Sequence, residues 1–112
     1  MDKIKKYQQI LIETIESYAK RWERPDDPLQ NIVIADVERG HFQFLRMGWK
    51  ENDYIFGAVF HFDIIDDKVW VQENRTDILI AEELVERGIP KTDIVLGLQP
   101  PYARPYTEYA AS

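Results

Sequence analysis

Residues 32–73 constrain the fold of this chain most, because they hold four strand-like segments separated only by short turns. Each segment is rich in β-branched and aromatic residues, which favour strands; the segments are 32–38, 41–49, 54–65 and 68–73. The turns between them fall at 39–40, 50–53 and 66–67. Turns this short join antiparallel neighbours, whereas parallel strands require a crossover of about a dozen residues or more. The stretch therefore predicts a four-stranded antiparallel meander.

A stripe of apolar residues at helical spacing precedes the sheet. Its members recur every three or four positions, which places them on one face of a helix; they are Ile4, Tyr7, Leu11, Ile15, Tyr18 and Trp22. Pro25 and Pro28 follow the stripe, and they end the helix because proline has no backbone N–H with which to continue it. The N-terminal segment is therefore predicted to be one long amphipathic helix.

A second, shorter helix is predicted over residues 77–87, after the last strand. Thr76 or Asp77 can cap its first turn, and Gly88 can end it. Residues 95–98 are a candidate short strand, and the prolines beyond them predict an extended path. The predicted fold is α+β: an antiparallel four-stranded meander with an N-terminal helix, a second helix after the sheet and an extended C-terminal tail.

The turn positions also predict which residues face each other across neighbouring strands. The predicted pairs are Asp63 with Trp70, His61 with Gln72, Asp36 with Gln43, and Val37 with Phe42. With residues 50–53 as a four-residue loop, this register gives the sheet two apolar faces. One face contains Ile32, Ile34, Leu45, Met47, Phe56, Phe60, Phe62, Ile64, Val69 and Val71; the other contains Val33, Val37, Phe42, Phe44, Ile55, Val59 and Trp70. The second face is therefore predicted to be covered by the C-terminal segment, by another copy of the chain in a homodimer, or by both.

Size and composition limit the class of protein. A chain of 112 residues is predicted to form one domain, 1–112. It has no cysteine, which excludes disulfides and thiolate metal sites and fits the reducing cytoplasm. The longest apolar run is shorter than the roughly 18 residues that span a membrane, so no membrane association is expected. The net charge is −6, with scattered basic residues, which argues against direct nucleic-acid binding.

The histidine content of the chain is low, and one of its two histidines, His61, lies two residues before Asp63 on one strand face. Together with Trp70 and Gln72 these residues form a candidate polar cluster. The cluster could transfer a proton or bind a metal, or it could be a hydrogen-bonded pair on a covered sheet face. The second interpretation is favoured, because a catalytic zinc normally takes three protein ligands.

The other histidine, His41, is predicted to lie at the end of the first hairpin near Asp36, Glu38 and Gln43. A metal site there also requires a third ligand from elsewhere, so a plain polar hairpin end is favoured. No catalytic, cofactor-binding or metal-binding residue is therefore expected, and no cofactor.

The C-terminal tail is a candidate interaction surface. Tyrosine and arginine are enriched at the energetic centres of protein interfaces, and the proline-containing tail has Tyr102, Arg104, Tyr106 and Tyr109. The alternative is that the tail simply wraps the domain and covers the second sheet face. One segment can do both.

Several motifs resemble those of one protein family, in the same order and over nearly the whole chain. They are residues 36–43 (DVERGHFQ), Gly48-Trp49, residues 61–64 (HFDI), 68–72 (KVWVQ) and 84–96 (LVERGIPKTDIVL), and the ending Pro100, Pro101, Arg104, Tyr106, Thr107. With these motifs the chain resembles the XisI-like family, the fdxN element excision controlling factors. The family's second hairpin loop usually reads Asp-Gly, whereas this chain has Asp66-Asp67, which makes the turn type and the register less firmly set.

The resemblance implies a cyanobacterial accessory protein in the excision of the fdxN element, a DNA recombination event of heterocyst development. It further implies action beside a recombinase and a companion, XisH, so an XisH-like protein is the expected partner. No functional residue transfers from the family to this chain.

Three functions remain open from the sequence. The favoured one is an accessory factor that acts by protein–protein interaction and is not an enzyme. The alternatives are a DNA-binding regulator of site-specific recombination and a small enzyme that uses His61 and Asp63.

Overall fold

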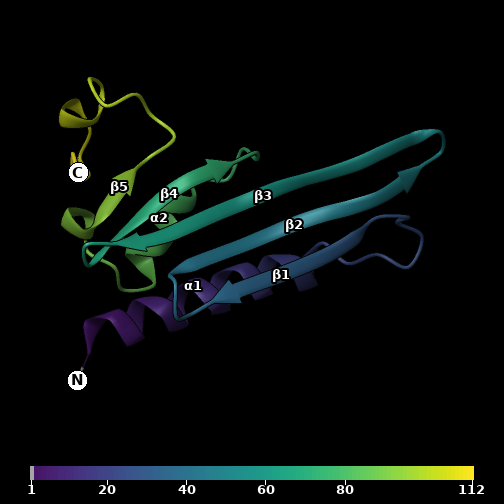
Figure 1. The fold of residues 1–112 in the computed structure, drawn as a ribbon, viewed down its shortest axis with the longest axis horizontal. Helices are drawn as coiled ribbons and strands as arrows, with labels where there is room; N and C mark the ends of the chain where they lie inside the picture. Colours follow the sequence, from purple (N-terminus) through teal and green to yellow (C-terminus); the bar gives the residue numbers. More distant parts are fainter. Residues whose placement is uncertain (1) are drawn as a thin grey trace.

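A computed structural model describes residues 2–112 and shows two helices and one sheet (Figure 1). In chain order the elements are α1 (Lys3–Arg21), β1 (Gln30–Asp36), β2 (His41–Lys50), β3 (Asp53–Ile65), β4 (Lys68–Asn74), α2 (Ile80–Glu86), the 3₁₀ turn η1 (Lys91–Asp93), β5 (Ile94–Leu96) and the 3₁₀ turn η2 (Arg104–Tyr106). The strands are ordered β1-β2-β3-β4-β5. The antiparallel meander is therefore confirmed for the first four strands.

The fifth strand makes the sheet mixed. β5 pairs parallel to β4, with Val69 opposite Ile94 and Val71 opposite Leu96. The prediction of four strands was one short, although it named 95–98 as a candidate strand. The parallel pairing is possible because α2 and its flanking loops provide the long crossover that parallel neighbours require.

The helices form largely as their sequences predict. The side chain of Asp2 caps α1 by accepting a hydrogen bond from the Ile4 N–H at 2.9 Å. The α2 helix begins three residues later than predicted, because Thr76 does not cap it. The Thr76 hydroxyl instead accepts a bond from the Ile78 N–H at 3.0 Å, in a turn that precedes the helix. Gly88, at φ 119°, ends α2 as expected.

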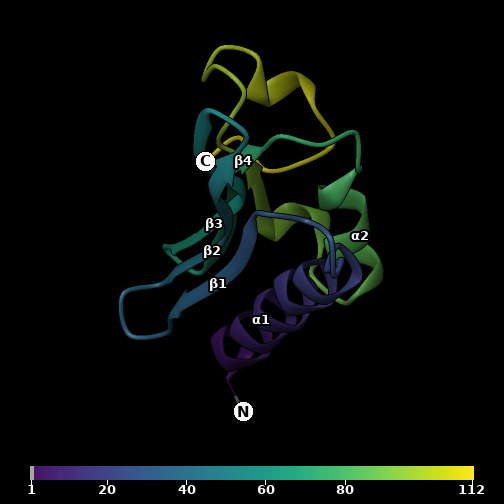
Figure 2. The same cartoon turned by 90° about the vertical axis from the view of Figure 1, so that its right-hand side faces the viewer.

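Both helices lie on one side of the sheet, as Figure 2 shows, and the core fills the space between the helices and the sheet. Four phenylalanines from β2 and β3 are fully buried there, together with aliphatic residues of α1 and α2; they are Phe42, Phe44, Phe60 and Phe62. The Phe60 and Phe62 rings stack with their centroids 5.9 Å apart. This aromatic layer is the centre of the fold.

The placement of these phenylalanines corrects the predicted sheet faces. The prediction put Phe42 and Phe44 on the opposite face from Phe60 and Phe62, because it ran the β2–β3 register without interruption. A β-bulge lies between Phe44 and Leu45, with Val59 as the extra residue on β3. One extra residue inverts the alternation of all side chains beyond it, and this bulge brings all four rings to the helix-covered face.

Two further details of register differ from the prediction. Asp36 pairs with His41 rather than with Gln43, so the first loop has four residues, closed by Gly40 at φ 78°. A second bulge pairs His61 with Glu73 instead of Gln72. The Asp63–Trp70 pair is confirmed, and the turn that sets it contains Asp66 and Asp67, both at positive φ.

The C-terminal tail covers part of the second face, over β4. The Arg104 guanidinium lies 5.1 Å from the centre of the Trp70 ring, and a side chain at Gly97 would overlap the Gln72 amide. The Ala110 N–H donates to the Ile94 carbonyl at 2.9 Å and adds a bridge beyond β5. This coverage agrees with the prediction for the tail, but Phe42, Phe44 and Val59, which were expected on that face, are buried beneath the helices or at the bulge. The homodimer stays a prediction.

Candidate functional site: a polar cluster on the open sheet face

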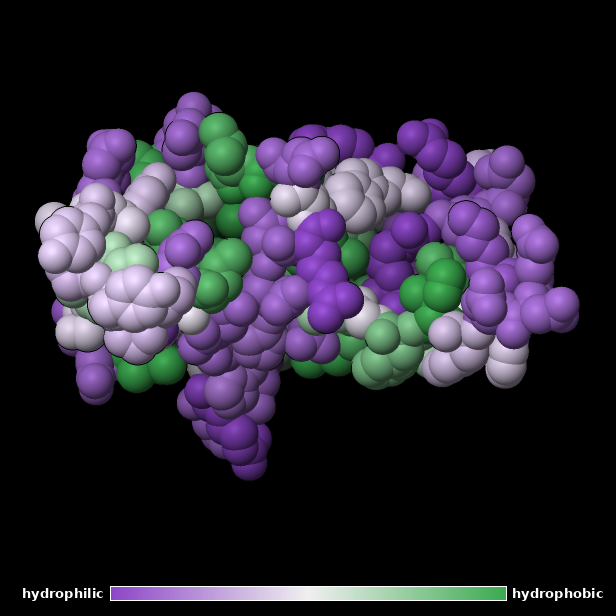
Figure 3. All heavy atoms as spheres, turned by 90° about the horizontal axis from the view of Figure 1, so that it is seen from above, coloured by the Kyte–Doolittle hydropathy of each residue, from purple (hydrophilic) through white to green (hydrophobic). Residues whose placement is uncertain are grey.

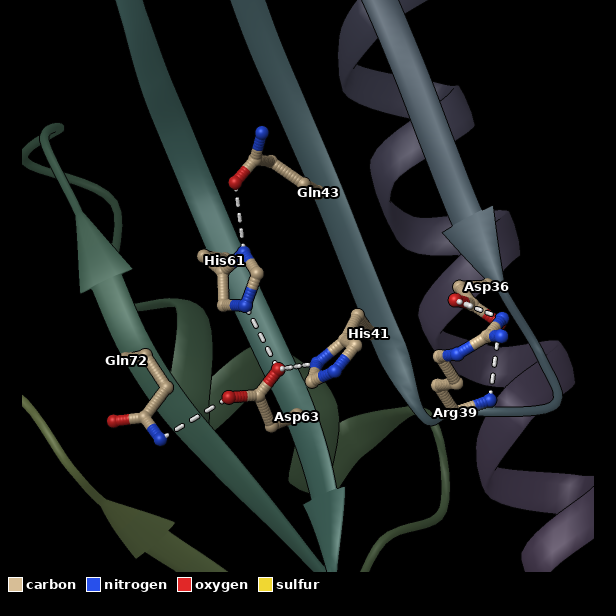
Figure 4. Close-up of polar contacts among 7 residues, drawn as sticks. All are labelled: Asp36, Arg39, His41, Gln43, His61, Asp63 and Gln72. Atoms are coloured by element: carbon tan, nitrogen blue, oxygen red, sulfur yellow. Dashed lines mark hydrogen bonds and ion pairs between the residues drawn. The ribbon is translucent and has the colours of Figure 1, made fainter.

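Two cross-strand pairs place polar side chains together on the face that the helices leave open. His41, at the start of β2, is directly opposite Asp63, near the end of β3. Gln43 is likewise opposite His61. Residues two apart on a strand share a face, so the four side chains converge, and Figure 4 shows them with Gln72 of β4 beside them.

Asp63 is the centre of this cluster, which we name the His–Asp–His cluster after His41, Asp63 and His61. Its Oδ1 lies 2.7 Å from Nδ1 of His41 and 2.7 Å from Nε2 of His61. Its Oδ2 accepts a hydrogen bond from the Gln72 amide at 3.3 Å. Nδ1 of His61, the second nitrogen of that ring, lies 2.8 Å from Oε1 of Gln43. Both oxygens of Asp63 are therefore engaged, and the His61 ring is held at both nitrogens.

The surroundings of Asp63 keep it ionised. Burial alone would raise its pKa, but hydrogen bonds from His41, His61 and Gln72 and the charge of His61 outweigh burial and hold the pKa below its ordinary value. Both nitrogens of His61 lie within hydrogen-bonding distance of oxygen atoms, which fixes the orientation of its ring. The cluster is thus a charged network on a sheet face.

The structure confirms part of the predicted cluster and adds a residue that the prediction left out. His61, Asp63 and Gln72 are hydrogen-bonded as a group, and Trp70 is the partly buried cross-strand neighbour of Asp63. The predicted cluster did not include His41, and a register without the β2–β3 bulge places that residue opposite Phe62. A register that includes this bulge places His41 opposite Asp63, and therefore beside His61.

Asp36 does not join the cluster, although it was predicted near His41 and is its cross-strand neighbour. Its carboxylate accepts bonds from the Arg39 N–H at 3.0 Å and from the Arg39 guanidinium at 3.4 Å (Figure 4). The hairpin end therefore contributes one histidine to the cluster and keeps its own acidic residue in the turn.

The pKa of Asp63 leads to a testable pH dependence of stability. Because its folded-state pKa is below the ordinary value of 3.8, the unfolded chain binds the proton more readily, and stability from this group is lost as the pH falls through that range. We expect Asp63→Asn to lose less unfolding free energy than the wild type between about pH 5 and pH 3. Urea denaturation at a series of pH values measures this difference.

The matched control for this experiment is Glu38→Gln, which removes one carboxylate from an exposed position of the same hairpin. It should retain the wild-type pH dependence. Parallel curves for the wild type and Asp63→Asn would contradict the assignment of this acid-sensitive stability to the cluster.

The four predicted interaction residues of the tail separate into two pairs. Arg104 lies on Trp70 and donates to the carbonyls of Gln99 and Gly97, and Tyr109 packs against the core, so these two hold the tail in place. Tyr102 and Tyr106 are 79% and 90% exposed, respectively. Only the second pair is available to a partner.

A second group of exposed aromatic residues lies on the distal half of the β2–β3 hairpin, which projects beyond the helices (Figure 1). It consists of Trp49, Tyr54 and Phe56, with the first two rings 5.2 Å apart. These three aromatic residues were not among the predicted site residues. The signal was the 13-residue length of β3 against 7 residues in β4, which leaves the first half of β3 without a β4 neighbour.

A family model and solved crystal structures are similar to this chain over nearly its whole length. The family model described as "XisI protein" matches residues 1–111. A crystal structure of a XisI-like protein from Anabaena variabilis ATCC 29413 is 43% identical, with a TM-score of 0.92 over 97% of this chain and 99% of that one. No curated protein matches the chain.

A second crystal structure from the same organism has the same fold. It is the fdxN element excision controlling factor XisI, which is 30% identical with a TM-score of 0.87, over 99% of this chain and 100% of that one. Within residues 2–112, neither helix has the length and apolar composition to cross a membrane. The match of the family model to almost every residue, together with these two structures, shows that the chain belongs to the XisI family.

Proposed function

We propose that this protein is an accessory factor that controls the excision of a DNA element and has no catalytic role of its own. One observation supports this most: the structure of an fdxN element excision controlling factor is 30% identical to this chain over nearly the full length of both. Relatives that share this much sequence and their whole fold commonly share their general role. The proposal transfers only that role.

We further propose that control is exerted through protein–protein contacts, in keeping with the charge of the chain. The net charge is −6, and 14 residues are lysine or arginine. Six of the 14 are paired with carboxylates within residues 2–112: Lys3 with Asp93, Arg39 with Asp36, Arg46 with Asp27, Arg75 with Glu73, Arg87 with Glu83, and Lys91 with Glu108. Cations that are already paired with carboxylates neutralise the charge of a phosphate backbone less effectively.

The proposed partner is an XisH-like protein, and the proposed contact is the exposed tyrosine pair of the tail. Tyr102 and Tyr106 lie on a tail held by Arg104 and Tyr109, so a partner would bind them with little loss of backbone entropy. Hydrophobic residues on the face in Figure 3 lie in separate groups among hydrophilic ones. Such a mixed surface suits a partner that associates and dissociates.

The test is co-purification of the full chain with a co-expressed XisH-like protein. We expect a stable complex, and we expect the double variant Tyr102→Ser/Tyr106→Ser to weaken it at least tenfold, as loss of an aromatic anchor worth about 2 kcal/mol would do. Binding measured by calorimetry or biolayer interferometry gives this ratio.

The matched control is Phe56→Ser, which removes another exposed aromatic residue, one on the distal hairpin. It should bind as the wild type does. If Phe56→Ser loses binding and the tyrosine variant keeps it, the contact surface is wrong. If two folded proteins form no complex and the chain alone binds duplex DNA with steep salt dependence, the proposed mode of action is wrong.

A further inference from the structure

The His–Asp–His cluster has the donor atoms of a metal site. His41, His61 and Asp63 each offer one ligand atom, and the three atoms lie within 4.8 Å of one another. Two imidazoles and a carboxylate form a common ligand set for divalent first-row transition metals. His41 is the third protein ligand that a site of His61 and Asp63 alone would lack.

The neighbouring amides prepare these side chains as ligands. Gln43 Oε1 accepts from Nδ1 of His61, which directs Nε2 toward the centre of the cluster. The Gln72 amide donates to Oδ2 of Asp63 and leaves Oδ1 for the centre. Metal-bound histidines and carboxylates characteristically have their second polar atom tied in this way, because it fixes the tautomer and the orientation of the ligand.

The backbone that supports the ligands is rigid. His41 and Asp63 are a cross-strand pair of β2 and β3, and His61 shares the same face of β3, two residues away. The opposite face at this point is the aromatic core, where Phe42 and Phe62 are fully buried. A site built on regular strands holds its geometry better than one built on loops.

The site is open on its outer side. The side chain of His41 is 53% exposed, whereas that of Asp63 is 14% exposed. An ion can therefore enter from solvent, and water can complete a tetrahedral set beside three protein ligands. Tetrahedral zinc with ligands at about 2.0–2.1 Å separates its donor atoms by about 3.3 Å. The Asp63 oxygen now lies 2.7 Å from each imidazole nitrogen, and all three donor atoms lie within 4.8 Å of one another, so only small side-chain rotations are needed.

We propose that His41, His61 and Asp63 bind one divalent transition-metal ion of the zinc class. The ion replaces the protons that now lie between Asp63 and the two imidazoles, so affinity falls as the pH is lowered. Magnesium and calcium prefer oxygen ligands, and two imidazoles select against them. The proposal is independent of the role in excision control and of any partner.

The test is calorimetric titration of the purified, tag-free full chain, stripped of metal, with zinc chloride at neutral and acidic pH. We expect one ion per chain at neutral pH and at least tenfold weaker binding in His41→Asn, His61→Asn and Asp63→Asn. Gln43→Leu, which removes only the support of His61, should lose affinity by about 10–100-fold. Cobalt(II) in place of zinc reports the coordination geometry, because tetrahedral cobalt(II) absorbs visible light much more strongly than octahedral cobalt(II).

Asp36→Asn is the matched control, because it removes a carboxylate beside His41 that is bound in the Arg39 turn. It should bind zinc as the wild type does. The chain has no cysteine and no third histidine, so specific binding at another imidazole or thiolate site is excluded. Circular dichroism confirms that each variant is folded. Absence of saturable binding by the wild type, equal binding by folded ligand variants, or equally strong binding of magnesium would each overturn the proposal.

Discussion

Replacing Phe62 by alanine is expected to lower the free energy of unfolding by about 3–5 kcal/mol. Phe62 is fully buried, lies opposite Phe42 and Val71 on the neighbouring strands, and stacks on Phe60. Alanine would remove the ring and leave a cavity between the sheet and the helices. The paired strands and the packed helices cannot move enough to close it. The loss is large against the roughly 5–15 kcal/mol by which domains are stable. Urea denaturation followed by circular dichroism at low temperature measures it.

Phe56→Ala is the matched control for this measurement. It makes the same substitution on the same strand, but Phe56 is 64% exposed on the distal hairpin. Its unfolding free energy should stay within about 0.5 kcal/mol of the wild type. Equal losses at the two positions would show that burial in the aromatic layer does not set the stability of this sheet.

Deleting residues 99–112 is expected to cost about 2–4 kcal/mol, because it uncovers an indole and removes a cation–π contact. The deletion removes Arg104 from the Trp70 ring, Tyr109 from the core and the hydrogen bond from the Ala110 N–H to the Ile94 carbonyl. The newly exposed apolar surface near β5 should also promote aggregation. Thermal unfolding and light scattering of the shortened chain measure both effects.

The Tyr102→Ser/Tyr106→Ser variant is the control, since it changes exposed tail residues and keeps the contacts that hold the tail. It should unfold at the wild-type temperature. A shortened chain that stays monomeric and as stable as the full chain would contradict the role of the tail as a cover for the second face.

Local patterns were sufficient for most elements of the fold. The apolar stripe and Pro25 define α1, and Gly88 defines the end of α2, because each acts within a few residues of its own position. The turn at Asp66 and Asp67 likewise sets the Asp63–Trp70 pair. The family motifs, which extend along nearly the whole chain, were sufficient for the family.

Bulges were beyond the reach of these patterns. A bulge is decided by how strands pack against a layer far away in the sequence. Here the extra residue, Val59, places Phe42 and Phe44 on the same buried face as Phe60 and Phe62, beneath α1 and α2. The same inserted residue moves His41 from opposite Phe62 to opposite Asp63. The fold of the core and the composition of the candidate site therefore depend on one packing event.

The order of helices and strands, the meander, the family and the pairing of Asp63 with Trp70 could all be predicted from the sequence. The tertiary structure alone decided which face each phenylalanine occupies, that His41 joins His61 and Asp63, and that Arg104 and Tyr109 anchor the tail while Tyr102 and Tyr106 stay exposed. The difference lies in how far apart along the chain the interacting residues are. Turns, caps and helical stripes depend on neighbours in the chain, whereas the register past a bulge and the seat of a tail depend on surfaces that meet only after folding.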